Sequence, residues 1–199
     1  GIMFFSTPFD YRAVDELEAL GVPVYKIASF EIVDLPLIRY AAAKGRPVIL
    51  STGLATYEDI HDALETCWAA GNRQTVLLQC ASLYPAPPAR MNLRAMATLR
   101  QAFGVPVGLS DHTRGIHVAG AAVALGACVV EKHFTLSRSL PGPDHPFAIE
   151  PQELKEMVGQ IREIEAALGD GRKLGPSPEE QEMHQKARRS LVAARAIPK

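Results

Sequence analysis

Six short apolar runs alternate with six longer amphipathic stretches through the first 168 residues of this chain. Such runs, rich in Val, Ile and Leu, are typical of strands that are buried in a parallel sheet, and the stretches between them have helical spacing. The sequence therefore predicts a parallel α/β fold. The expected strands are Ile2–Ser6, Val24–Ala28, Pro47–Ser51, Thr75–Cys80, Val105–Ser110 and Ala127–His133, and the expected helices are Asp10–Leu20, Leu35–Lys44, Tyr57–Ala70, Leu93–Phe103, Ile116–Leu125 and Glu150–Leu168.

A glycine follows each expected helix, as left-handed helix caps prefer. Because the strands are strongly apolar and the loops after them are chemically rich, the period favours a (β/α)8 TIM barrel with about six of its eight strand-helix units present. A complete barrel typically needs ~250 residues, and a strand begins directly after Gly1. We therefore expect residues 1–168 to be a fragment, a partial TIM-barrel catalytic domain with strands 3 to 8. The alternative is an open, doubly wound sheet. The glycines are Gly21, Gly45, Gly71, Gly104, Gly126 and Gly169.

The carboxyl-terminal stretch differs in composition from the barrel segment. Residues 169–189 are rich in Gly, Pro and charge, which predicts a linker. Ser190–Arg195 has the pattern of a first strand, so we expect a further domain to begin at 190–199. A frayed tail is the alternative.

Composition argues against several classes of protein. The 199 residues are 47% hydrophobic and 22% charged, as in a globular domain, and 21 basic against 22 acidic side chains leave a net charge of −1. Without a dense basic block, neither nucleic acid nor a membrane is an expected partner. The three cysteines lack Cys-x-x-Cys spacing. No apolar run approaches the length that a membrane span needs, and no signal-peptide pattern precedes the first expected strand. We expect a cytoplasmic protein.

Two expected strands each lead to a histidine: His112 comes just after Val105–Ser110, and His133 is the last residue of Ala127–His133. The carboxyl ends of neighbouring parallel strands meet at the ligand site, and side-chain alternation places Ser110 on the face of His112 and Glu131 on the face of His133. Two imidazoles that share one divalent ion leave positions for water and substrate, which suits a catalytic metal. Manganese, magnesium and zinc are all compatible with this donor set.

The other strand ends carry a lysine among hydroxyl groups. Lysine supplies positive charge and Ser or Thr supplies short hydrogen bonds, so the set predicts a site for a phosphorylated anion. Lys26 is alternatively a Schiff-base lysine of an aldolase. Asp144, in the loop after the last strand, is placed to accept hydrogen bonds from sugar hydroxyls. The residues of the set are Thr7, Lys26, Ser29, Ser51, Ser82 and Tyr84, with Glu31 close by.

Seven motifs, in order along the chain, resemble those of the sialic acid synthases. The resemblance implies a TIM barrel that condenses phosphoenolpyruvate with N-acetylmannosamine, or a related 2-acetamido sugar, to give N-acetylneuraminate or a related nonulosonic acid and phosphate. It also implies a manganese ion on His112 and His133. The motifs are Phe5-Ser-Thr-Pro-Phe-Asp10, Tyr25-Lys-Ile-Ala-Ser29, Leu50-Ser-Thr-Gly53, Ser82-Leu-Tyr-Pro85, Gly108-Leu-Ser-Asp-His-Thr113, Glu131-Lys-His-Phe-Thr135 and Gly142-Pro-Asp-His145.

The same resemblance implies a role for each candidate residue. Glu131 would lie beside the metal-bound water, Glu31 near the reacting centre, and Tyr84 with Asp144 would hold the sugar. Thr7 would bind the carboxylate of phosphoenolpyruvate. The phosphate would be held by Lys26, Ser29, Ser51, Ser82 and Ser110, although the family commonly has Asn where this chain has Ser82.

Members of this family have two earlier barrel strands with an active-site glutamate and lysine, and a carboxyl-terminal antifreeze-like domain that lends an arginine across a homodimer. The resemblance thus implies that residues 190–199 are the start of a truncated antifreeze-like domain and that the full-length protein is a homodimer. Two alternatives stay open within the family, N,N'-diacetyllegionaminate and pseudaminate synthase. Pro141-Gly-Pro-Asp-His145 resembles the sialic and legionaminic branch more than the pseudaminic one. A Schiff-base aldolase or a catalytically inert fragment is the alternative outside it.

Overall fold

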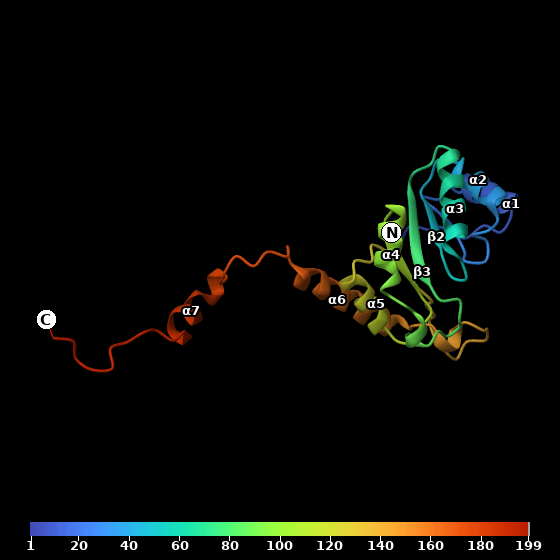
Figure 1. Ribbon diagram of the computed structural model, residues 1–199. Helices are drawn as coiled ribbons and strands as arrows, with labels where there is room; N and C mark the ends of the chain where they lie inside the picture. Colours follow the sequence, from blue (N-terminus) through green and yellow to red (C-terminus); the bar gives the residue numbers. More distant parts are fainter. Residues whose placement is uncertain (199) are drawn as a thin grey trace. The chain divides into compact units, whose positions relative to one another are not determined.

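A computed structural model describes residues 1–198, which form two compact units: Gly1–Ala167, and a second that begins at Leu168. The first unit holds one parallel sheet of five strands in sequence order (Figure 1). The predicted partial (β/α) barrel is confirmed, because consecutive parallel neighbours joined by helices give a curled sheet of this kind. The strands are β1 (Tyr25–Ile27), β2 (Val48–Ser51), β3 (Thr75–Cys80), β4 (Val107–Asp111) and β5 (Val130–Lys132).

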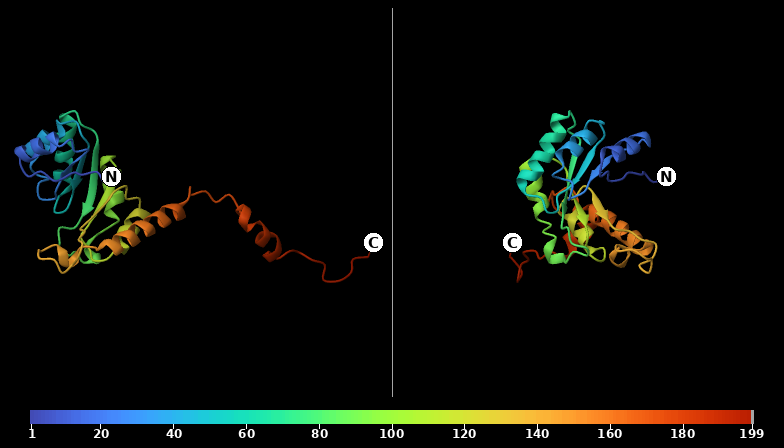
Figure 2. Two further views of the ribbon diagram at one scale, coloured as in Figure 1. Left: turned by 180° about the vertical axis from the view of Figure 1, so that it is seen from behind. Right: turned by 90° about the vertical axis from the view of Figure 1, so that its right-hand side faces the viewer.

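Each strand-to-strand connection contains a helix, and Figure 2 shows the helices of this unit around the outside of the strands. Helix α3 begins with a capping box in which Thr56 and Asp59 bond each other's backbone N–H groups. All six predicted cap glycines have positive φ, so the helix ends follow the sequence signal. The helices of the unit are α1 (Tyr11–Ala19), α2 (Leu35–Ala42), α3 (Tyr57–Ala69), α4 (Ala95–Phe103), α5 (His117–Ala124) and α6 (Pro151–Leu168), with short 3-10 turns η1 (Pro88–Arg90) and η2 (His145–Phe147).

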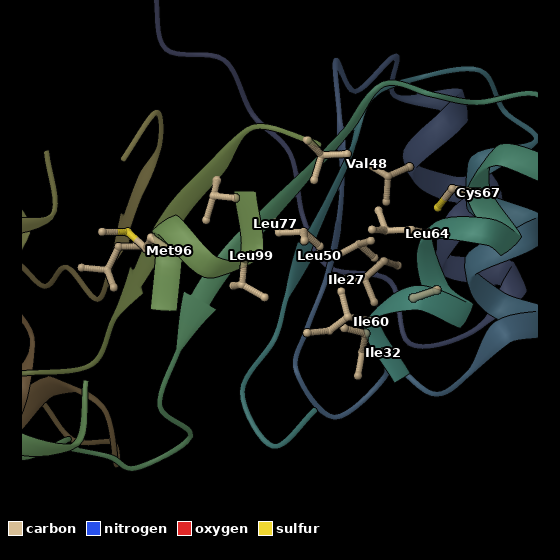
Figure 3. Packing of buried hydrophobic residues seen from close by; sticks show 14 of the residues in the cluster. Ile27, Ile32, Val48, Leu50, Ile60, Leu64, Cys67, Leu77, Met96 and Leu99 are labelled. Carbon is tan, nitrogen blue, oxygen red and sulfur yellow. The ribbon is translucent and has the colours of Figure 1, made fainter. Parts of the chain in front are cut away.

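The register of the sheet separates an apolar face from a polar one. Ile27, Leu50 and Leu77 occupy one row across β1, β2 and β3, and their side chains pack against Leu64 and Cys67 of α3 (Figure 3). The alternate residues, which include Lys26 and Ser51, belong to the opposite face, because successive side chains of a strand point to opposite sides. The core therefore lies between the sheet and the helices, and the other face carries the site.

Two expected strands are absent from the described residues. Residues 2–6 pair with no strand, and the side chains of Ile2 and Met3 are exposed, so the segment gains neither ladder hydrogen bonds nor burial. The second unit contains η3 (Pro178–Glu180) and α7 (Gln181–Ala187) and has no strand at 190–195. A single extended segment without a partner leaves its backbone groups unpaired. The expected linker thus contains a short helix, while the antifreeze-like domain stays a prediction.

Candidate active site

A pocket of about 540 Å³ opens on the polar face at the carboxyl ends of the strands. In (β/α) barrels this end of the sheet carries the functional groups. Both predicted histidines and most predicted substrate contacts line it, and Ala28 and Lys132 are added by the structure. The lining residues are Thr7, Lys26, Ala28, Tyr84, Ser110, His112, Glu131, Lys132, His133 and Asp144.

A chain of polar contacts crosses the pocket from β1 to β5. The Nζ of Lys26 donates to Ser51 Oγ at 2.8 Å and lies 3.6 Å from Glu131 Oε2. The hydroxyl of Ser110 donates to the other oxygen of Glu131 at 2.6 Å. Burial lowers the pKa of Lys26, and the nearby carboxylate of Glu131 opposes that shift. The pocket therefore combines a desolvated amine, hydroxyl donors and one carboxylate.

His112 and His133 lie side by side, with ring centroids 5.3 Å apart. The Nδ1 of His112 is 2.8 Å from the Ala81 carbonyl oxygen. Since a carbonyl only accepts, Nδ1 carries the hydrogen, and the lone pair of Nε2 is left for a ligand. The ring of Tyr84 packs on His112 at a centroid distance of 4.2 Å, and Phe147 lies 5.0 Å from His133. These aromatic contacts fix the planes of both imidazoles.

The histidine pair fits a catalytic divalent ion. Burial lowers the pKa of His133 and so favours the neutral imidazole that metals bind. The pKa of His112 is raised, because its contacts with Cys80 and the Ala81 carbonyl outweigh the effect of burial. The carboxylate of Asp144 lies 3.6 Å from His133 Nδ1. Within residues 1–198 no group of three or more His, Cys, Asp or Glu side chains is arranged to hold a metal. Two imidazoles with open positions are a donor set for a substrate-binding ion and are too few for a closed structural site.

Four predicted site residues lie outside the pocket lining. Ser51 reaches it through Lys26, whereas the Ser29 hydroxyl accepts from the Gly53 backbone N–H at 3.0 Å. The buried Ser82 Oγ has no hydrogen-bond partner. A Cβ on Gly53 would come within 2.3 Å of Ser82 Oγ and 2.9 Å of Ser29 Oγ, so the two hydroxyls converge where only glycine fits. Glu31 follows β1 and has one buried oxygen without a partner.

Three contributors were not predicted from the sequence. Phe147 packs on His133 from the loop before α6, and its apolar side chain in a Pro-rich loop gives no local signal. Asp111 and Lys132 form a buried ion pair directly beside the two histidines. Their positions, one residue before each histidine, are a detectable signal, but alternation assigns them to the opposite face of the sheet.

A curled parallel sheet with a lysine, hydroxyls and a histidine pair at its carboxyl ends defines a (β/α)-barrel domain with an enzyme-like site. The chain belongs to the NeuB family, whose model matches residues 1–173. The predicted membership of the sialic acid synthase family is thereby confirmed.

Individual relatives agree with this membership. Over its whole length the chain is 50% identical to the N,N'-diacetyllegionaminic acid synthase of Campylobacter jejuni, and the aligned region covers 60% of that protein. Over 83% of its length the chain is 46% identical to the pseudaminic acid synthase of Helicobacter pylori, and the aligned region covers 49% of that protein. The crystal structure of the N-acetylneuraminic acid synthetase of Leptospira borgpetersenii, in complex with citrate, superposes with a TM-score of 0.85 at 40% identity, covering 92% of this chain and 64% of that one. The chain spans 46–60% of the length of the curated relatives it matches.

Proposed function

We propose that the protein containing this chain condenses phosphoenolpyruvate with a 2-acetamido sugar and water, giving a nonulosonic acid and phosphate. The observation that carries the proposal is one pocket with two chemically distinct ends. Lys26 and its hydroxyl partners suit an anion, while the histidine pair suits a metal-bound carbonyl oxygen. Glu131 contacts both Lys26 and Ser110 at the anionic end and lines the same pocket as the two histidines.

The anionic end would hold phosphoenolpyruvate. Lys26 supplies the charge for the phosphate, and short hydrogen bonds come from the hydroxyls near it. Thr7, on the pocket wall, would bind the carboxylate. The unpartnered hydroxyl of Ser82 is a free donor in the position where the family commonly has Asn. The proposed phosphate contacts are Lys26, Ser29, Ser51, Ser82 and Ser110.

The opposite end would hold the sugar in its open-chain form. His112 and His133 would hold a divalent ion, with manganese as the first candidate, and this ion when bound would polarise the sugar aldehyde. Tyr84 and Asp144 line the same end and are placed to bind sugar hydroxyls. Glu131 would accept a proton from the water that adds to the substrate, with Ser110 holding the carboxylate in place.

The proposed reaction forms one C–C bond and breaks one C–O bond. Carbon 3 of phosphoenolpyruvate attacks the sugar aldehyde, water adds at carbon 2, and phosphate leaves with the bridging oxygen. N-acetylmannosamine is the first sugar to assay. The names of the relatives support also testing the 2,4-diacetamido precursors of legionaminic and pseudaminic acid.

We expect the full-length protein to be a homodimer, and light scattering would measure its molar mass.

The test uses the full-length gene product and phosphoenolpyruvate labelled with ¹⁸O in the bridging position. We expect phosphate release that depends on the acetamido sugar and on manganese, with the label retained in phosphate. His112→Ala should abolish release, and His117→Ala is the matched control because that histidine is exposed on α5. No sugar-dependent release with any of the three sugars, or label in the keto acid, would refute the proposal. Borohydride trapping at Lys26 would instead support a Schiff-base aldolase.

No helix among residues 1–198 has the length and apolar character that a membrane crossing requires.

A further inference from the structure

Asp111 and Lys132 form an ion pair that is buried inside the domain. The Nζ of Lys132 lies 2.8 Å from Asp111 Oδ2, and the two side chains are 4% and 0% exposed. Lys132 also donates to the Thr113 carbonyl oxygen at 2.7 Å. The other oxygen of Asp111 accepts from the backbone N–H and the hydroxyl of Thr113, at 2.9 and 2.7 Å. Both carboxylate oxygens are therefore bonded, and the ammonium group has two acceptors.

This pair lies in the row of the sheet that packs against the helices. In the register, Asp111 and Lys132 are opposite each other and follow Leu109 and Val130 on the same face. Leu109 belongs to the main hydrophobic core. Removing two charges from water is costly, and a buried pair in such a layer often contributes no more stability than apolar residues of similar size. A role in positioning explains the pair better than a role in stability.

The pair is located where the ladder between β4 and β5 ends. Asp111 and Lys132 are the last paired residues, and His112 and His133 come next. Beyond that point the carbonyl of His112 accepts from Ala86, and the carbonyl of His133 accepts from Ile149. The backbone of each histidine is thus bonded to a different segment. Lys132 continues the link between the two strands, because it binds the residues on both sides of His112.

We infer that Asp111 and Lys132 are positioning residues whose ion pair, extended to Thr113, sets the separation of the His112 and His133 imidazoles and thereby the affinity for a divalent metal. The inference rests on the metal site of the proposed function. Two imidazoles bind one ion tightly only if their neighbours hold them in the productive geometry. The charged atoms of the pair bind each other and Thr113, and Lys132 also lines the pocket that holds both histidines.

The experiment measures the Kd of the full-length gene product for Mn²⁺ by electron paramagnetic resonance of the free ion, without substrate. Lys132→Met and the double variant Asp111→Leu/Lys132→Met are compared with the wild type. The double variant removes both charges together but leaves the buried N–H and hydroxyl of Thr113 without their acceptor. It should therefore be less stable than the wild type but more stable than Lys132→Met, which leaves an uncompensated buried carboxylate. We expect both variants to bind Mn²⁺ about 10–100-fold more weakly.

Two further variants separate an effect on stability from an effect on the positions of the histidines. Leu64→Ala empties a fully buried position on α3, so it should lower the melting temperature and leave the Mn²⁺ Kd unchanged. Lys132→Arg keeps the positive charge but changes the length and shape of the side chain that carries it. This variant should weaken Mn²⁺ binding, and it provides the test if Lys132→Met does not fold. Unchanged Mn²⁺ affinity in the folded double variant, or in Lys132→Arg, would overturn the inference.

His112→Ala distinguishes this failure from failure of the proposed function. If the wild type binds Mn²⁺ and His112→Ala does not, the metal site stands, and the Lys132 variants test the positioning role alone. If His112→Ala binds Mn²⁺ as tightly as the wild type, or the wild type does not bind it, the proposed metal site is wrong and the inference fails with it.

Discussion

Gly108 of β4 lies in close contact with the backbone of Val129, the residue before β5. A Cβ at this position would lie 2.3 Å from the Val129 carbonyl oxygen and 2.9 Å from Leu78 Cδ2. Carbon and oxygen atoms in neighbouring strands normally approach to ~3.3 Å, so Gly108→Ala must open the β4–β5 seam by about 1 Å at that point. The obstructing atom is backbone, and no side-chain rotation relieves the clash.

The expected cost of Gly108→Ala follows from these contacts. Overpacking of a core costs about 1–3 kcal/mol. The Leu109 N–H donates to the same Val129 oxygen at 2.9 Å, and stretching that bond by the same amount loses about 1 kcal/mol more. Alanine restricts the unfolded chain and returns about 0.4–1 kcal/mol. We expect a net loss of about 2 kcal/mol, which for a chain of this size lowers the melting temperature by about 4–8 °C.

Urea unfolding followed by circular dichroism measures this loss, with two matched glycine substitutions as controls. A Cβ on Gly159, inside α6, meets no atom within 4 Å, so Gly159→Ala should stabilise the protein by about 0.5–1 kcal/mol. A Cβ on Gly120 meets only the flexible end of Ile164, at 2.9 Å, so Gly120→Ala should fall between the other two. If Gly108→Ala is as stable as Gly159→Ala, the predicted clash between a Cβ at residue 108 and the backbone beside β5 is wrong.

Four further substitutions test other parts of the molecule. Thr56→Ala removes the side-chain cap of α3 and should cost about 1 kcal/mol in urea unfolding. Hydrogen bonds from the backbone and side chain of Thr56 hold the pKa of Asp59 below its ordinary value. The stabilisation from Asp59 is therefore complete above its unfolded pKa of about 3.9 and is lost as pH falls through the folded pKa. Asp59→Asn should accordingly flatten the acid limb of the stability profile, and an unchanged limb would contradict this assignment. Asn72→Ala leaves the carbonyl groups of Ala42 and Arg46 and the N–H group of Gln74 without their partner, so we expect a loss of roughly 2–3 kcal/mol. A loss below 1 kcal/mol would indicate that water replaces the amide. Ser110→Ala removes the short hydrogen bond to Glu131 and should lower kcat/KM for the proposed condensation by about 10–100-fold with little change in melting temperature.

The sequence by itself determined the order and type of the regular elements. Thr75–Cys80 is a strand over its full predicted range, and the six cap glycines adopt positive φ. These predictions depend on local rules, because buried strands must be continuously apolar and only glycine enters the left-handed region without strain. Alternation along a strand is equally local, so the common face of Ser110 and His112, and of Glu131 and His133, followed from the sequence.

Only the tertiary structure decided which neighbours those residues have. Residues 2–6 have the composition of a strand, but pairing depends on a partner segment, and none pairs with them among residues 1–198. The contact of Phe147 with His133 and the burial of Asp111 with Lys132 arise from segments that meet in space. The register of the sheet sets the Asp111–Lys132 encounter, and register is a property of strand pairing that no single strand encodes. The Phe147 contact depends on the path of the loop that carries η2.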